Sequence, residues 1–120
     1  MAITTTAATA LEAFRGALDA KDYDALESCY AEDAVYLGYS ERNRPSSAEA
    51  LRGPEAIGRL FRDAPADLTH EIVDEVVGEA RFAITLRCTY PTGELVLGTT
   101  ICEVRDGLIT RQTGVETWDE

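Results

Sequence analysis

Apolar residues recur at helical spacing in the first part of the chain. Leu11, Phe14 and Leu18 lie three and four residues apart, with alanines beside them, which predicts a helix with one apolar stripe. Asp22 is suited to begin a second helix, because its carboxylate can accept a hydrogen bond from a backbone N–H group of the first turn. The apolar face expected on this second helix consists of Leu26, Cys29 and Tyr30.

A short β-rich run, residues 34–39, follows the second helix and leads into a polar stretch at 40–47. A third helix is predicted to open at Gly53-Pro54, because proline is well tolerated in the first turn of a helix. Its apolar stripe consists of Ile57, Leu60 and Phe61. The first half of the chain is therefore predicted to be mainly helical.

The second half has the composition of β-strands, rich in Val, Ile, Thr and aromatic residues. Asp106-Gly107 predicts a two-residue hairpin turn, since both residues tolerate positive φ. Residues 91–93 predict a second, three-residue turn. The strands predicted between these turns span 68–77, 80–90, 94–105 and 108–118.

The two turns also predict the strand register. A two-residue turn places Arg105 opposite Leu108, and uninterrupted alternation then places Cys102 opposite Arg111. One face of the sheet should meet the helices. Its predicted members are Phe82, Ile84, Leu86, Cys88, Val96, Gly98, Thr100, Cys102, Ile109, Arg111, Thr113 and Val115.

The opposite face of the predicted sheet is mixed. It carries Arg81, Thr85, Arg87, Leu97, Thr99, Ile101, Gln112, Glu116 and Trp118. Leu95, Leu97, Ile101 and Trp118 make this side too apolar for a fully hydrated surface, and no helix is left to cover it. We therefore expect a homodimer through the outer sheet face.

Together these elements predict an α+β fold. Three N-terminal helices pack on a strongly curved antiparallel sheet and enclose one internal pocket. At 120 residues, the chain fits a single domain spanning 1–120.

Composition and charge limit the kinds of partner that the protein can bind. The net charge is −11, and such an acidic surface repels phosphate backbones and anionic lipid, so we expect no nucleic acid and no membrane as partners. No run approaches the ~18 apolar residues of a membrane span, and Met1–Ala10 does not have the pattern of a signal peptide. A cytoplasmic location is expected.

Metal and cofactor motifs are not apparent in the sequence. Cys29, Cys88 and Cys102 are widely spaced and His70 is the one histidine, which argues against a structural zinc site. No P-loop, dinucleotide-binding glycine pattern or nucleophile elbow is present. We expect no metal and no cofactor.

The segments "DYDALESCYAEDAV" and "LRGPEAIGRLF", followed by four long strands, resemble the nuclear transport factor 2-like superfamily. The resemblance is strongest to its polyketide-cyclase-like (SnoaL-like) and ketosteroid-isomerase-like members, and it covers about Leu11 to Trp118. It implies a sheet curled into a cone-shaped half-barrel whose open end is a ligand pocket. The family includes isomerases, cyclases, epoxide hydrolases, dehydratases and proteins without chemistry, so the resemblance does not choose a reaction.

The resemblance does argue against one mechanism. The ketosteroid isomerase base, its oxyanion-binding tyrosine and its protonated aspartate align with Gly38, Phe14 and Thr100. A carboxylate base and two strong donors are what an enolate mechanism needs. Ketosteroid isomerisation by this mechanism is not expected.

Other residues are candidates for chemistry in the pocket. Arg111 is predicted to point inward, where it either pairs with an acid or contacts a ligand. His70 is a candidate proton acceptor, and Tyr30, on the second helix, and Tyr36 are candidate hydrogen-bond donors, each with a plain structural role as the alternative. The residues expected to line the ligand are Phe14, Leu18, Leu60, Phe82, Ile84, Leu86, Thr100, Cys102 and Val115.

Three functions remain open from the sequence. The first is a cofactor-free isomerase, cyclase or hydrolase acting on a small apolar carbonyl compound or epoxide. The second is a non-catalytic binding module for a small hydrophobic molecule. The third is a dimerising domain with a vestigial pocket.

Overall fold

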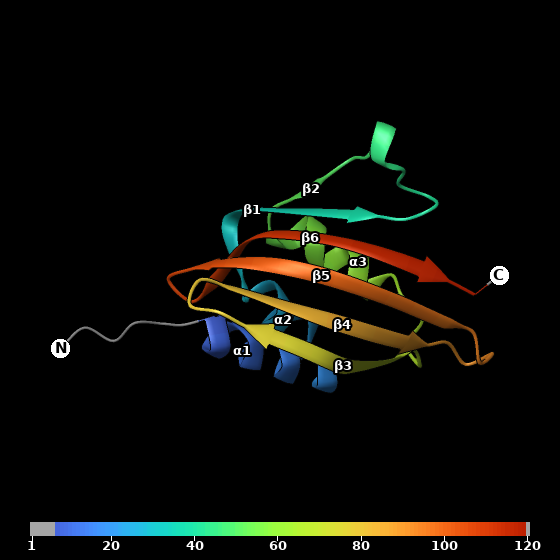
Figure 1. Ribbon diagram of the computed structural model, residues 1–120. Helices are drawn as coiled ribbons and strands as arrows, with labels where there is room; N and C mark the ends of the chain where they lie inside the picture. Colours follow the sequence, from blue (N-terminus) through green and yellow to red (C-terminus); the bar gives the residue numbers. More distant parts are fainter. Residues whose placement is uncertain (1–6, 120) are drawn as a thin grey trace.

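The computed structural model describes residues 7–119, and Figure 1 shows them as three helices on one side of a curved, open sheet. Residues 1–6, part of the segment in which no signal peptide is predicted, lie outside the described residues. The elements are α1 (Ala7–Ala20), α2 (Tyr23–Glu27), β1 (Tyr30–Tyr39), the 3₁₀ turn η1 (Pro45–Ser47), β2 (Leu51–Arg52), α3 (Pro54–Arg62), β3 (Thr69–Val77), β4 (Arg81–Thr89), β5 (Leu95–Arg105) and β6 (Leu108–Trp118). This is the predicted α+β fold.

The six strands form one sheet in the order β2-β1-β6-β5-β4-β3. The pairs β3–β4, β4–β5 and β5–β6 are antiparallel, as predicted. One pair differs from the predicted antiparallel sheet: β1 runs parallel to β6. The long connection through β2, α3 and three further strands makes this possible, because parallel neighbours need a crossover rather than a hairpin.

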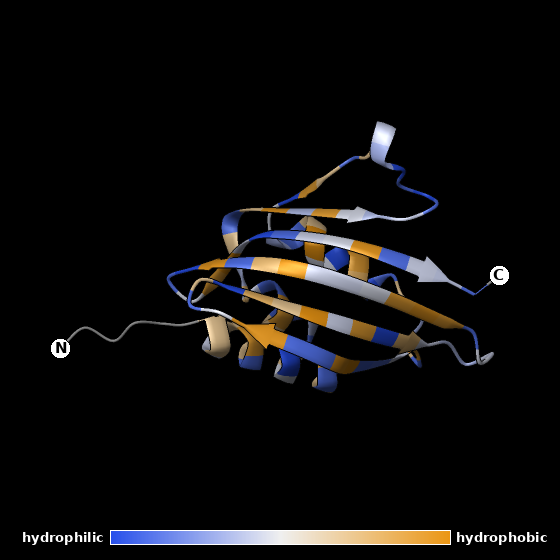
Figure 2. Cartoon of the chain, viewed as in Figure 1, coloured by the Kyte–Doolittle hydropathy of each residue, from blue (hydrophilic) through white to orange (hydrophobic). Residues whose placement is uncertain are grey.

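The core lies between the helices and the inner face of the sheet. Phe14 of α1 packs against Phe82 of β4, with ring centroids 6.3 Å apart, and both side chains are fully buried. Figure 2 shows the matching pattern, with hydrophobic segments alternating with polar ones along the strands and helices. The alternation predicted from the sequence therefore gives the core of β4 and β5 correctly.

Local signals set most element boundaries. The Asp22 carboxylate accepts a hydrogen bond from the Ala25 N–H at 3.0 Å and so caps α2. Pro54 starts α3 after Gly53, whose φ of 87° favours glycine. Asp106 and Gly107, at φ 54° and 79°, form the predicted hairpin turn.

The second helix is shorter than predicted. It ends at Glu27, and the chain enters β1 at Tyr30. Tyr30 is therefore a strand residue and not a member of the helical face with Leu26 and Cys29. Its backbone pairs with Ile109 of β6, which fixes the start of β1 beside the last strand.

Candidate functional site

A cavity of about 400 Å³ lies between the inner face of the sheet and the C-terminal end of α3. Phe14, Leu60 and Phe61 line it from the helices, and Ile84 and Leu86 line it from β4. The other polar or aromatic residues around it are Tyr36, Tyr39, Arg42, Asp63, His70, Cys88, Tyr90, Thr99, Thr100, Gln112, Glu116 and Trp118. An apolar cavity with few polar groups is the usual form of a small-molecule site.

A β-bulge in β6 determines which side chains of that strand face the cavity. Arg105 pairs with Leu108 as predicted, but Glu103 pairs with Arg111 and Cys102 with Gln112, so Thr110 is an extra residue. Its hydroxyl donates to the Glu103 carbonyl at 3.2 Å. One inserted residue moves every later side chain to the other face of the sheet.

The bulge corrects the placement of Arg111. Arg111 is exposed on the outer face and does not line the cavity, so the prediction that it points into the pocket was wrong. Val115, also predicted to face inward, is 63% exposed, although it borders the cavity. Trp118 and Glu116, predicted on the outer face, line the cavity instead.

Gln112 takes the inward position that was predicted for Arg111. It is a buried polar residue and lines the cavity. The Tyr30 hydroxyl donates a hydrogen bond to Gln112 Oε1 at 2.5 Å. Tyr30 itself does not line the cavity, and burial raises the pKa of its hydroxyl well above its usual value. Tyr30 thus holds the Gln112 side chain from the core side by its amide oxygen, which leaves the amide N–H groups of Gln112 free to donate toward the cavity.

Tyr36 lies beside Gln112, because the two residues are partners in the parallel β1–β6 pair. Its ring runs along the strand over Gly38. A Cβ atom at Gly38 would lie 2.8 Å from Tyr36 Cε1, so only glycine leaves room for this ring. Burial first, and then the charge of Glu116, raises the pKa of the Tyr36 hydroxyl. Tyr36 is therefore protonated at neutral pH and can donate a hydrogen bond into the cavity.

His70 lines the cavity from β3, where it pairs with Cys88 of β4. A bulge at Val73 interrupts the alternation of this strand, because Ile72 pairs with Leu86 whereas Asp74 pairs with Thr85. Nδ1 of His70 is buried and has no hydrogen-bond partner among the described residues. Burial, followed by the charge of Lys21, lowers the pKa of the imidazole.

Glu116 is a functional candidate that sequence reasoning missed. Its carboxylate accepts a hydrogen bond from Trp118 Nε1 at 3.2 Å. Burial and the Glu116 charge together raise the pKa of the Cys88 thiol to about 11. The thiol is therefore protonated at neutral pH. No local signal in the sequence marks the bulge that turns Glu116 inward.

The apolar lining predicted from the sequence divides into two groups. Phe14, Leu60, Ile84, Leu86 and Thr100 line the cavity. Leu18, Phe82 and Cys102 are buried in the core and do not line it, so their predicted contact with a ligand was wrong. Within residues 7–119 no group of three or more His, Cys, Asp or Glu residues is arranged to hold a metal ion. No helix in the same described range is long and apolar enough to cross a membrane.

The structure is an α+β fold in which three helices and a curved, open sheet border a mostly apolar cavity. A profile of the SnoaL-like domain matches residues 11–112, and the chain belongs to this family. The SnoaL-like family is part of the nuclear transport factor 2-like superfamily predicted from the sequence. No curated protein sequence matches the chain.

Solved structures share the fold at low sequence identity. A candidate ketosteroid isomerase from Kribbella flavida is 23% identical, with a TM-score of 0.78 over 99% of this chain and 83% of that one. An LEH-like epoxide hydrolase from Mycobacterium tuberculosis is 24% identical, with a TM-score of 0.70 over 95% and 84%. A computationally designed 17-OHP binder is 22% identical, with a TM-score of 0.69 over 94% and 98%. These similarities establish the fold and leave the activity open.

Proposed function

We propose that the chain binds a small, mostly apolar molecule in this cavity and acts on it as a cofactor-free isomerase, cyclase or hydrolase. The substrate would be a small carbonyl compound or an epoxide. The observation that carries the proposal is His70, whose buried Nδ1 has no hydrogen-bond partner within residues 7–119 and lies on the wall of an apolar cavity. A buried polar atom without a partner is uncommon unless a ligand or water completes it.

The lowered pKa of His70 keeps its imidazole neutral at pH 7, which is the form that accepts a proton. The raised pKa of Tyr36 keeps its hydroxyl protonated, so that it can stabilise an oxygen that becomes negative. In an isomerisation, His70 would take a proton from the carbon beside a carbonyl and return it to another carbon. With an epoxide, the same base would activate the water that opens the ring.

Glu116 supplies a negative charge on the same cavity wall. Its hydrogen bond from Trp118 fixes one carboxylate oxygen and leaves the other for a substrate proton. The epoxide hydrolase from M. tuberculosis has the same fold, which supports the class of reaction without assigning it.

A binding module without catalysis is the second candidate. The observation in its favour is the chemistry at the positions that align with the ketosteroid isomerase residues. Phe14 and Gly38 have no polar side chain, and the Thr100 hydroxyl already donates to the Thr113 carbonyl at 3.2 Å. A cavity with so few reactive groups can serve recognition alone.

Two substitutions test the catalytic proposal. His70→Gln removes the proton acceptor and Tyr36→Phe removes the donor, and each should lower kcat/KM about 100-fold or more on any epoxide or enolisable ketone that the parent converts. Arg111→Gln, on the outer face, is the matched control and should leave turnover unchanged. Binding of the neutral fluorophore anilinonaphthalene is measured in parallel. If the parent binds the fluorophore but converts none of the epoxides and enolisable ketones tested, the binding module is favoured. If it neither binds the fluorophore nor converts any of these compounds, the proposal is contradicted.

We also propose a homodimer through the outer sheet face. Leu95, Leu97, Ile101 and Val115 are each at least 40% exposed on that face. Trp118, which the sequence predicts on the same face, lines the cavity. Light scattering should give about twice the chain mass of 13.1 kDa, and Leu97→Glu should give a monomer. A monomeric parent at micromolar concentration contradicts the dimer.

The three cysteines are free thiols. Free thiols of this kind are typical of a reducing compartment. We therefore propose that the protein acts in the cytoplasm.

A further inference from the structure

An aromatic and acidic cluster lies at the mouth of the cavity. The ring centroids of Trp118 and Tyr90 are 5.9 Å apart, and Trp118 Nε1 donates to Glu116 Oε1 at 3.2 Å. The guanidinium carbon of Arg42 lies over the Trp118 ring, 5.3 Å from its centroid. All four residues line the cavity. We call Trp118, Tyr90 and Glu116 the mouth cluster.

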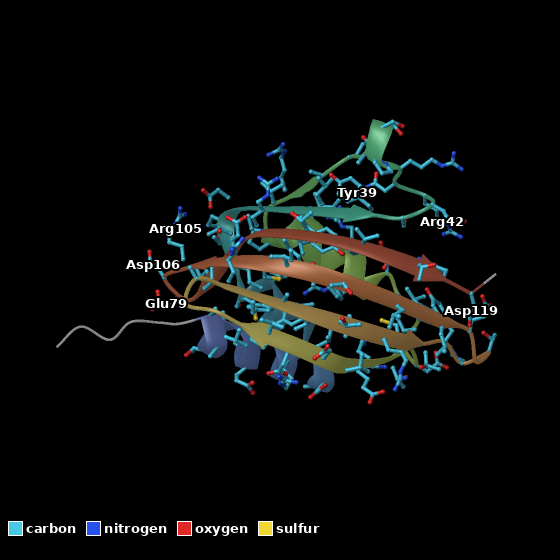
Figure 3. All side chains as sticks on the ribbon, in the orientation of Figure 1. Tyr39, Arg42, Glu79, Arg105, Asp106 and Asp119 are labelled. Carbon is cyan, nitrogen blue, oxygen red and sulfur yellow. The ribbon has the colours of Figure 1, made fainter. Side chains whose placement is uncertain are left out.

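The mouth cluster is held by backbone pairing. Asp119 N–H donates to the Leu95 carbonyl and Leu95 N–H donates to Asp119 Oδ2, each at 3.0 Å. Tyr90 N–H donates to the Glu94 carbonyl at 2.9 Å and so closes the β4–β5 turn. Figure 3 shows Arg42 and Asp119 at the same end of the sheet. The aromatic pair is thus positioned by β4, β5 and β6 and does not depend on Arg42.

Arg42 is attached to this cluster loosely. It is exposed and lies in the turn between Ser40 and Asn43, which is fixed by the Asn43 side chain: Nδ2 donates to the Gly38 carbonyl at 2.7 Å, and Oδ1 accepts from Glu49 N–H at 2.9 Å. Within residues 7–119 no ion pair holds the Arg42 guanidinium, and its contact there is the Trp118 ring. The side chain can therefore leave while the turn stays in place.

The remaining charges of the cavity favour a cation. Glu116 and Asp63 are the carboxylates on its lining, and Arg42 is the one Lys or Arg side chain among the described residues that line it. His70 is neutral because burial lowers its pKa. Asp63 also follows the last residue of α3, and the C-terminal end of a helix carries partial negative charge. With Arg42 turned away, the lining holds two negative charges and no positive one.

We propose that the mouth cluster is a subsite for the cationic head, an alkylammonium group, of an otherwise apolar ligand, and that Arg42 occupies this subsite until the ligand displaces it. The proposal rests on the proposed function, because the apolar body of the ligand would fill the cavity described above. A cation over the face of tryptophan is attracted by the ring quadrupole, and a carboxylate that is bonded to the same indole adds attraction. The position of Arg42 shows that the ring face accepts a positive group.

An anionic head fits this mouth less well. A carboxylate could bind Arg42 only by drawing the guanidinium from the ring face, and Glu116 and Asp63 would repel it. The net charge of −11 adds to this repulsion and attracts cations from solution. An ammonium ligand gains from each of these features.

Three naphthalene probes with the same ring test the proposal by titration calorimetry: naphthylmethyl-trimethylammonium, neutral naphthylmethanol and anionic naphthylacetate. The variant Arg42→Ala empties the subsite and should tighten binding of the ammonium probe about fivefold, while the affinity for the alcohol changes less than about twofold. Arg44→Ala, an exposed arginine of the same loop that does not line the cavity, is the matched control and should change neither affinity.

Glu116→Gln in the Arg42→Ala background should cancel most of the gain for the ammonium probe and leave the alcohol unaffected. Equal affinities for ammonium and alcohol in Arg42→Ala overturn the cation subsite but leave the proposed function intact. Tighter binding of naphthylacetate that is lost in Arg42→Ala overturns it in favour of an anion site. If none of the probes binds the parent or Arg42→Ala, both the subsite and the proposed function are contradicted.

Discussion

The β4–β5 ladder and the β5–β6 ladder lie side by side in one sheet but are built differently. From Arg81–Glu103 to Thr89–Leu95, β4 and β5 pair without interruption, and the inner face of β4 up to Leu86 is apolar. The β5–β6 ladder contains the Thr110 bulge. Beyond it, the residues of β6 that turn toward the cavity are mostly polar or small, namely Gln112, Gly114 and Glu116, and the strand ends on the aromatic Trp118.

This difference separates the two tasks of the sheet. The regular ladder carries Phe82, which packs on α1 and stabilises the fold. The bulged strand contributes Gln112 and Glu116 to the polar lining of the cavity, and its parallel neighbour β1 adds Tyr36 beside Gln112. Bulges often re-aim side chains at functional sites in this way.

The largest expected effect is on the regular ladder. Phe82→Ala removes a fully buried ring and should lower the free energy of unfolding by about 3–5 kcal/mol in urea titrations. Phe82→Leu keeps most of the volume and should cost less than about half as much. A loss of under about 1 kcal/mol for Phe82→Ala would show that α1 is not packed on β4 as described.

Local sequence signals predicted much of the fold. Asp22 caps α2, Pro54 starts α3 and Asp106-Gly107 forms the hairpin turn, because each acts through its own backbone geometry. The residues on the inner face of β4 were predicted from the alternation of side chains along the strand alone. These features depend on neighbours in the chain, which a single sequence displays.

The facing of the β6 side chains was predicted wrongly because one residue is inserted in the β5–β6 ladder. Thr110 is β-branched and fits a regular strand, so nothing local marks it as the extra residue, and alternation then placed Arg111 inside and Glu116 outside. The parallel pairing of β1 with β6 joins residues about 80 positions apart, and no turn signal reports it. The sequence therefore placed His70, Tyr36 and Thr100 on the cavity correctly, but put Arg111 where Gln112 lies and missed Glu116.

A pair of neighbouring substitutions tests the bulge. Gln112→Met keeps the length of the side chain but leaves the buried Tyr30 hydroxyl without its acceptor, and should lower the free energy of unfolding by about 1–3 kcal/mol. Arg111→Met changes an exposed residue and should stay within about 0.5 kcal/mol. If urea titrations show a larger loss of stability for Arg111→Met than for Gln112→Met, the bulge is contradicted and the regular register, with Arg111 inside, is supported.

The double variant Tyr30→Phe with Gln112→Met is the control for this interpretation. Replacing both partners of a buried hydrogen bond by apolar groups is often close to neutral. The double variant should therefore recover most of the stability that Gln112→Met loses. If it is no more stable than Gln112→Met, the loss comes from packing and not from the hydroxyl.

The smallest expected effect concerns the pH dependence of stability, at the edge of the regular ladder where His70 pairs with Cys88. Burial is the main cause of the lowered imidazole pKa, the positive charge of Lys21 adds to it, and Asp19 opposes it. The unfolded chain titrates near the usual value of about 6.5. It therefore binds more protons than the folded chain once the pH falls below that value.

Stability that is fully present above about pH 6.5 is then lost as the pH falls through the folded pKa. His70→Gln removes this titration, so the variant should lose less stability than the parent between about pH 7.5 and 5.5. The surface carboxylates titrate in both proteins, so the difference between their urea midpoints at each pH reports the contribution of His70 alone. His70 is the only histidine in the chain, which makes the comparison direct. If the two pH profiles run parallel, the imidazole is solvated like that of the unfolded chain. The dry cavity wall on which the role of His70 as a base depends would then be excluded.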